Sequence, residues 1–135
     1  AETITALLGP EVVVTETPII SMPEKIVEVC TELRERQDGT VAVILVSESP
    51  ENFRNMKTKL VELDPDLTVL SSRQCKGLEF RHGVVVDLML HDFDPDRISH
   101  SRYQLLSCLY VAVTRFRNSV TCLATIGSPL LPDHP

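Results

Sequence analysis

The run Val41-Ala42-Val43-Ile44-Leu45-Val46 constrains the fold most, because six successive apolar residues leave no polar face. A strand of this kind is covered on both sides, which is typical of a central strand in a parallel sheet. Other apolar runs alternate with segments that have helical spacing. We expect further strands at 12–14, 67–71, 83–88 and 119–125, and helices at 23–36, 50–63 and 102–115. The alternation predicts an α/β fold, a three-layer domain with a mostly parallel central sheet.

Local signals set the expected boundaries. Ser21 is a plausible N-cap for the first helix, and Gly39 ends it. Ser49 caps the second helix, with Pro50 in its first turn. The length predicts one domain over residues 1–135, and the prolines in 128–135 indicate a loose tail. Because ligands of parallel sheets bind beyond the carboxyl ends of strands, we expect the polar loop 72–82 at that edge.

Charge and cysteine content exclude several classes of protein. A formal net charge of −6 argues against a free-standing nucleic-acid module, which usually carries a basic face. The four cysteines are scattered without a CxxC pair, and no signal peptide or membrane-length apolar run occurs. We therefore expect a cytoplasmic protein with no membrane partner and with cysteines that serve as small buried side chains.

No metal site is expected. The segment 91–96 has the alternating aspartates of an EF-hand loop, but Arg97 stands where that loop requires glycine. Tyr103 replaces its glutamate ligand. His82 and His100 have no ligand partner at a recognised spacing, so both are expected to be solvated loop residues.

Two segments carry residues suited to nucleotide chemistry, Gln74-Cys75-Lys76-Gly77-Leu78-Glu79-Phe80 and Leu109-Tyr110-Val111-Ala112-Val113-Thr114-Arg115. Arg115 offers a planar fork of donors that suits a γ-phosphate, or it complements the negative end of a helix dipole. Lys76 could contact a phosphate of nucleotide or DNA, or be merely exposed. Gly77 allows a tight turn that brings backbone donors near a phosphate. The carboxylate of Glu79 can accept hydrogen bonds from ribose hydroxyls, or it is a solvated loop acid.

The pair of segments resembles motifs V and VI of superfamily 1 helicases of the UvrD/Rep type, whose usual wording is close to AKGLEF and LYVALTR. The resemblance implies the second RecA-like motor domain, called 2A, of an ATP-dependent DNA helicase or helicase-like translocase. It implies that Arg115 is the arginine finger and that Glu79, with Gly77 and Lys76, contacts the nucleotide. Ser72 and Arg73 occupy the stretch where the family meets single-stranded DNA. The sequence departs from the family pattern at Ser71, Ser72, Arg73, Cys75, Arg81 and Phe116.

The resemblance also implies cofactors and partners. ATP and magnesium would be bound mainly by an N-terminal motor domain, because this sequence has no GxxxxGK[ST] phosphate loop and begins without methionine. We expect a C-terminal piece of a larger enzyme, inactive alone, whose partners are that domain and single-stranded DNA.

A second interpretation stays open, because only residues 47–73 separate the apolar strand from the motif V-like segment. UvrD/Rep enzymes carry a large insertion in this region. The compact arrangement resembles HelD-type proteins or the RecD-like branch. HelD-type proteins bind RNA polymerase, so the alternative is a nucleotide-controlled protein that remodels RNA polymerase without unwinding. A third possibility, a small-molecule-binding α/β domain, would require a complete pocket within this chain.

Overall fold

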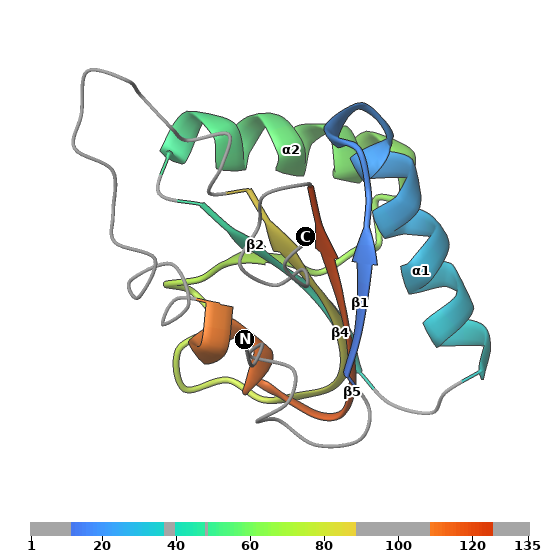
Figure 1. Ribbon diagram of the computed structural model, residues 1–135, viewed down its shortest axis with the longest axis vertical. Helices are drawn as coiled ribbons and strands as arrows, with labels where there is room; N and C mark the ends of the chain where they lie inside the picture. Colours follow the sequence, from blue (N-terminus) through green and yellow to red (C-terminus); the bar gives the residue numbers. More distant parts are fainter. Residues whose placement is uncertain (1–11, 37–39, 48, 89–108, 126–135) are drawn as a thin grey trace, which may run out of the picture.

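The computed structural model describes residues 12–36, 40–47, 49–88 and 109–125 (Figure 1). Its elements, in chain order, are β1 (Val12–Glu16), η2 (Ile19–Ser21), α1 (Met22–Arg36), β2 (Val41–Val46), α2 (Pro50–Leu63), β3 (Val69–Ser71), β4 (Phe80–Asp87) and β5 (Phe116–Ala124). Residues 109–113 are helical as well.

The described strands form one five-stranded sheet in the order β1-β5-β4-β2-β3, and every pairing is parallel. β2 lies between two neighbours, since Val43 is in register with Val84 on one side and with Val69 on the other. Five of its six residues are buried. The expected α/β fold with a parallel central sheet is confirmed, and the continuous apolar run of β2 is explained by its central place.

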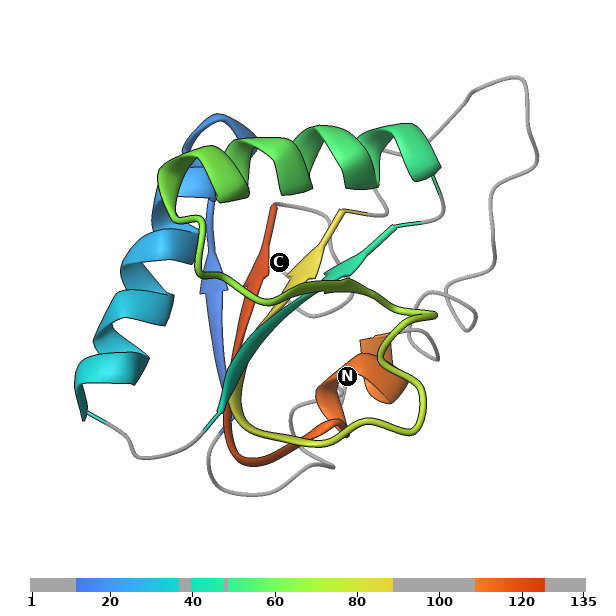
Figure 2. The same cartoon turned by 180° about the vertical axis from the view of Figure 1, so that it is seen from behind.

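The connections cover the two faces of the sheet in a regular way. The chain moves in one direction across the sheet from β1 to β2 and then to β3, and α1 and α2 lie on the same face. It returns from β3 to β4 and then to β5, and loop 72–79 and helix 109–113 lie on the opposite face (Figures 1 and 2). Because the chain changes face when it reverses its direction across the sheet, all connections between its parallel strands have the same handedness.

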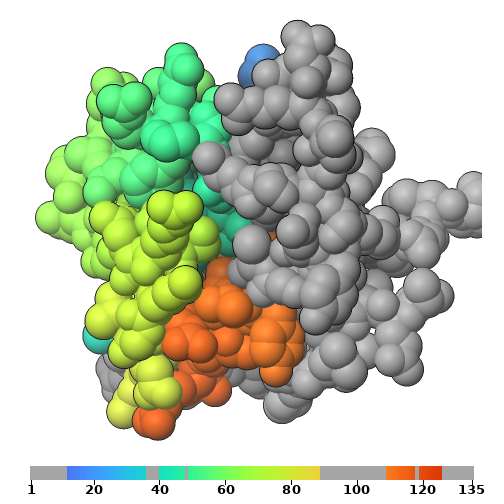
Figure 3. All heavy atoms as spheres, turned by 90° about the vertical axis from the view of Figure 1, so that its left-hand side faces the viewer, coloured from blue at the N-terminus to red at the C-terminus, as the bar shows by residue number. Residues whose placement is uncertain are grey.

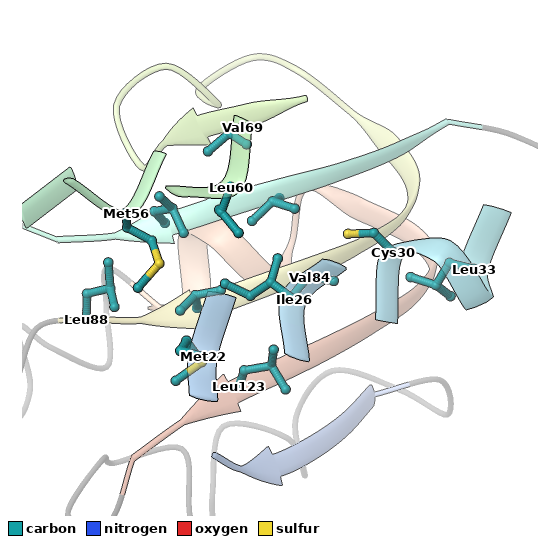
Figure 4. Packing of buried hydrophobic residues seen from close by; sticks show 13 residues of the cluster. Met22, Ile26, Cys30, Leu33, Met56, Leu60, Val69, Val84, Leu88 and Leu123 are labelled. Atoms are coloured by element: carbon teal, nitrogen blue, oxygen red, sulfur yellow. The ribbon is translucent and has the colours of Figure 1, made fainter. Parts of the chain in front are cut away.

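Side chains of β2 alternate between two separate cores. Val43 and Leu45 point to the face covered by the two long helices, where α1 contributes Ile26 and α2 contributes Leu60 (Figure 4). Ile44 and Val46 point to the other face, into a cluster with Cys75, Val85, Leu109, Ala112, Val113, Val120, Cys122 and Ala124. The sheet therefore has a packed layer on each side, which confirms the three-layer architecture.

The N-cap of α2 was predicted correctly, and long-range strand pairing was not. The Ser49 side chain accepts a hydrogen bond from the Asn52 N–H, with Pro50 as the first helical residue of α2, as expected. β4 begins at Phe80 rather than Gly83 and β5 at Phe116 rather than Ser119, because Phe80 pairs with Phe116.

Other expectations differ at the ends of elements or fall outside the described residues. α1 begins at Met22, directly after the single helical turn η2, and β3 starts two residues later than expected. His82 is buried within β4, so its prediction as a solvated loop residue is wrong. The expectations for Gly39, residues 91–100, helix positions 102–108 and the tail 128–135 fall outside the described part of the chain.

Candidate functional site

Loop 72–79 runs along the sheet from the carboxyl ends of the strands to their amino ends. This corrects its predicted position. The loop leaves the carboxyl end of β3 after Ser71 and reaches the amino end of β4 at Phe80. Ser71 is level with Leu45, whereas Phe80 lies two residues before the partner of Val41. At ~3.3 Å per residue, the two ends differ by roughly 20 Å along the strand direction. Because β3 and β4 are parallel, the chain must run back across the sheet, so only the beginning of the loop lies at the carboxyl edge.

The first half of the loop is a compact turn anchored by a cysteine. The side-chain oxygen of Gln74 accepts from the Ser71 N–H at 2.9 Å, and the Ser71 hydroxyl accepts from the Gln74 N–H at 3.1 Å. The Cys75 thiol is fully buried and donates to the Ser72 carbonyl at 3.1 Å. The turn is therefore fixed at Cys75, while residues 76–79 are exposed.

Gly77 supplies the backbone conformation that ends this turn. Its φ is +79°, in the left-handed region that favours glycine, and a side chain built there would meet nothing within 4 Å. The requirement for glycine is thus conformational, which agrees with the turn that the sequence predicted at Gly77.

The two segments that resemble helicase motifs meet at the amino edge of the sheet. The Phe80 N–H donates to the Arg115 carbonyl at 2.8 Å, and the Phe80 and Phe116 rings lie 6.0 Å apart between centroids. The Phe116 ring also lies against Gly83, where a β-carbon would overlap it. The loop (yellow-green) and segment 109–117 (orange) lie side by side on one face of the molecule (Figures 2 and 3).

Arg115 is half-buried, and its guanidinium folds back over the helix that precedes it. Nε donates to the Val111 carbonyl at 3.1 Å, and one terminal nitrogen donates to the Thr114 hydroxyl at 3.3 Å. These contacts are those expected of a cation at the end of a helix. A guanidinium has five N–H donors, so the two contacts leave capacity for a phosphate.

Arg115 also lies close to the loop. Burial raises the pKa of the Cys75 thiol, and the positive charges of Arg115 and Lys76 partly oppose that rise. The positive charge of Arg115 therefore acts on the turn that carries the other predicted nucleotide-binding residues.

Glu79 forms an ion pair with a residue that the sequence did not single out. Its Oε2 lies 3.0 Å from Nε of Arg117, the second residue of β5. Both side chains are largely exposed, 60% for Glu79 and 70% for Arg117.

The other predicted residues are less closely associated with this junction. Lys76 and Arg73 are exposed, and Ser72 is half-buried at the start of the loop. Ser72 and Arg73 follow β3 directly, so they lie toward the carboxyl edge of the sheet. The structure thus brings the segments of Glu79 and Arg115 together through the backbone hydrogen bond between Phe80 and Arg115, and places the predicted nucleic-acid residues at the far end of the loop.

The described residues include no group of three or more histidine, cysteine or acidic side chains that could hold a metal ion. His82 makes a 2.8 Å hydrogen bond between Nδ1 and the Ser119 hydroxyl, and its buried Nε2 has no hydrogen-bond partner. No helix of the described part is long and apolar enough to cross a membrane.

Comparison with known proteins yields a likeness of fold. No protein-family model matches the sequence, and no curated protein matches it. Solved structures do match, including the C-terminal domain of a possible DNA helicase from Lactobacillus plantarum WCFS1. That match has a TM-score of 0.61 at 19% identity and covers 86% of this chain and 73% of the other. The α/β architecture is consistent with a RecA-like fold.

Proposed function

We propose that this chain is the C-terminal motor domain of a superfamily 1 ATP-dependent DNA helicase or helicase-like translocase. The observation that carries the proposal is the junction at the amino edge of the sheet, where Glu79 and Arg115 are joined through Phe80 and Phe116. The two segments lead into β4 and β5, and the pairing of these strands brings them to one edge of the sheet, as the two motifs of a composite nucleotide site require. The helicase-domain neighbour, similar in fold, supports the same assignment.

The exposed and half-buried groups at this junction fit half of an ATP site. Arg115 has unused donors for a γ-phosphate, whose charge is redistributed during transfer, and the carboxylate of Glu79 can accept from a ribose hydroxyl. Lys76, exposed in the same loop, adds a positive charge for a phosphate. An N-terminal motor domain would complete the site across the interface.

Magnesium does not fit the described residues, because they include no cluster of carboxylates or other ligands that could hold it. When bound beside ATP, magnesium neutralises charge that develops on the phosphate oxygens. The proposal therefore assigns magnesium and the phosphate loop to the N-terminal domain. The residues of this chain bind the ribose and stabilise the γ-phosphate.

Contact with single-stranded DNA is assigned to the opposite end of the loop. Arg73 is exposed there and can donate to phosphate oxygens, and Ser72 lies beside it. A single loop that carries nucleotide contacts at one end and DNA contacts at the other gives a direct mechanical link between the two ligands. With a net charge of −6, the chain should hold DNA only weakly unless the other motor domain contributes.

The RNA polymerase-remodelling alternative is favoured by one observation. β2 connects to β3 through α2 alone, so no domain is inserted ahead of loop 72–79. This compact connection is what the HelD-type resemblance implies. In that case the same nucleotide site would control binding to RNA polymerase, and DNA would not be the ligand that stimulates hydrolysis.

The two functions are separated by ATP turnover of the intact protein with and without single-stranded DNA. A motor should be stimulated by DNA, and Arg73→Gln should weaken that stimulation without abolishing basal turnover. Arg54→Gln on α2 is a matched control, because Arg54 is exposed but lies outside the loop. ATP turnover that is indifferent to DNA, together with stable binding to RNA polymerase, would favour the alternative. Absence of ATP binding would contradict both.

A further inference from the structure

The ion pair between Glu79 and Arg117 has a geometric consequence rather than an energetic one. Its 3.0 Å contact joins side chains that are 60% and 70% exposed. Exposed ion pairs add little to stability because water screens them and two long side chains lose freedom. In this structure the pair nevertheless orients the Glu79 carboxylate toward β5.

The backbone on both sides of the pair is held firmly. The N–H of Phe80, next to Glu79, donates a hydrogen bond to the Arg115 carbonyl at 2.8 Å. Phe116, next to Arg117, pairs with Phe80 in the sheet, and its ring lies over Gly83 in the neighbouring strand. The carboxylate is thus presented by the loop residue next to β4, and the guanidinium by the second residue of the neighbouring β5.

Arg117 is distinct from Arg115 in what it contacts. The Arg115 guanidinium is bonded to the Val111 carbonyl and the Thr114 hydroxyl within its own helical segment. Arg117 instead reaches Oε2 of Glu79 through Nε. A carboxylate has two oxygens that each accept hydrogen bonds, so Oε1 can accept a ribose hydroxyl while Arg117 holds Oε2.

We propose that Arg117 is a positioning residue that holds the Glu79 carboxylate in place for a ribose hydroxyl of the bound nucleotide. Arg117 therefore determines how strongly the site selects a ribonucleotide. The inference rests on the proposed function, since it deepens the role assigned to Glu79. It adds a residue that touches neither phosphate nor ribose and acts through another side chain.

The test compares binding of ATP and 2′,3′-dideoxy-ATP to the intact protein by calorimetric titration. Arg117→Gln should raise the dissociation constant for ATP roughly fivefold, because a charge-assisted hydrogen bond to the ribose is weakened. The constant for dideoxy-ATP should barely change, so the preference for ribose falls. Arg117→Lys should restore part of the preference. Arg81→Gln, an exposed arginine on β4 near the same edge, is the matched control and should leave both constants unchanged.

A double variant separates positioning from direct contact. Glu79→Ala should abolish the ribose preference, and adding Arg117→Gln should then have no further effect on it. If Arg117→Gln weakens the binding of ATP and of dideoxy-ATP equally, Arg117 contacts the phosphates, and the inference is overturned. Tighter ATP binding would also overturn it, because Arg117 would then compete with the ribose for Glu79. If Glu79→Ala keeps the full ribose preference, the role of Glu79 in the proposed function fails as well.

Discussion

Replacement of Gly83 by alanine should destabilise the domain strongly at one defined point. A β-carbon there would overlap Cε1 and Cζ of Phe116 and lie 2.6 Å from the carbonyl oxygen of Ala42. The ring can move, but the Ala42 carbonyl belongs to β2, the central strand, so the spacing of β2 and β4 would have to yield. Overpacking in a core typically costs about 1–3 kcal/mol, and displacement of the Phe116 ring adds lost packing. We expect Gly83→Ala to lower the free energy of unfolding by ~3 kcal/mol.

Denaturant unfolding of Gly83→Ala, Phe116→Ala and the double variant measures this effect. Removing the Phe116 ring relieves one of the two overlaps, so the double variant should be more stable than the sum of the single losses predicts. The clash with the Ala42 carbonyl should remain and prevent full recovery. A Gly83→Ala protein within about 0.5 kcal/mol of the parent would refute the close packing of Phe116 on β4.

Three further predictions concern capping, pH dependence and thiol reactivity. Ser49→Ala should cost about 1 kcal/mol in denaturant unfolding, because the first turn of α2 loses its N-cap acceptor. The Arg34 guanidinium, 2.7 Å from Asp64, lowers the pKa of that carboxyl below its unfolded value. Its contribution to stability is therefore complete above about pH 4 and lost as the pH falls through the folded pKa, so Arg34→Gln should flatten the acid limb of a stability-against-pH curve. Burial raises the pKa of Cys30 to about 11 and of Cys122 to about 12. Peptide mapping after iodoacetamide treatment at pH 8 should therefore show both thiols modified only when the protein is unfolded. Modification in the native state would contradict their burial.

The fold was predictable where the signal is local. Six apolar residues identified β2 as a buried strand, and Ser49 with Pro50 identified the start of α2 within one residue. The starts of β4 and β5 were missed because they depend on Phe80 meeting Phe116, residues that are far apart in the sequence. Propensity within either segment cannot reveal that partner, since strand length is set by pairing as well as by composition.

The residues of the candidate site were likewise predictable where the signal is local and missed where it depends on contacts between distant segments. Glu79 and Arg115 were identified from their own segments, and the structure brings those segments together. The predicted position of the loop was wrong, because we expected the whole loop to stay at the carboxyl ends of the strands. His82 was misread since its burial comes from the extension of β4, and Arg117 was overlooked since its value lies in its contact with Glu79.

ATP turnover and ATP affinity of an Arg115→Ala variant of the intact protein decide whether Arg115 is an arginine finger. Turnover should fall by roughly 10³ or more, because an arginine finger acts on the transition state, while ATP affinity should change far less. Loss of the helix-end contacts to Val111 and Thr114 should cost only about 1 kcal/mol of stability, which thermal melting checks. A variant that melts like the parent and hydrolyses ATP within a few-fold of it would contradict the claim and leave Arg115 as a helix-end charge.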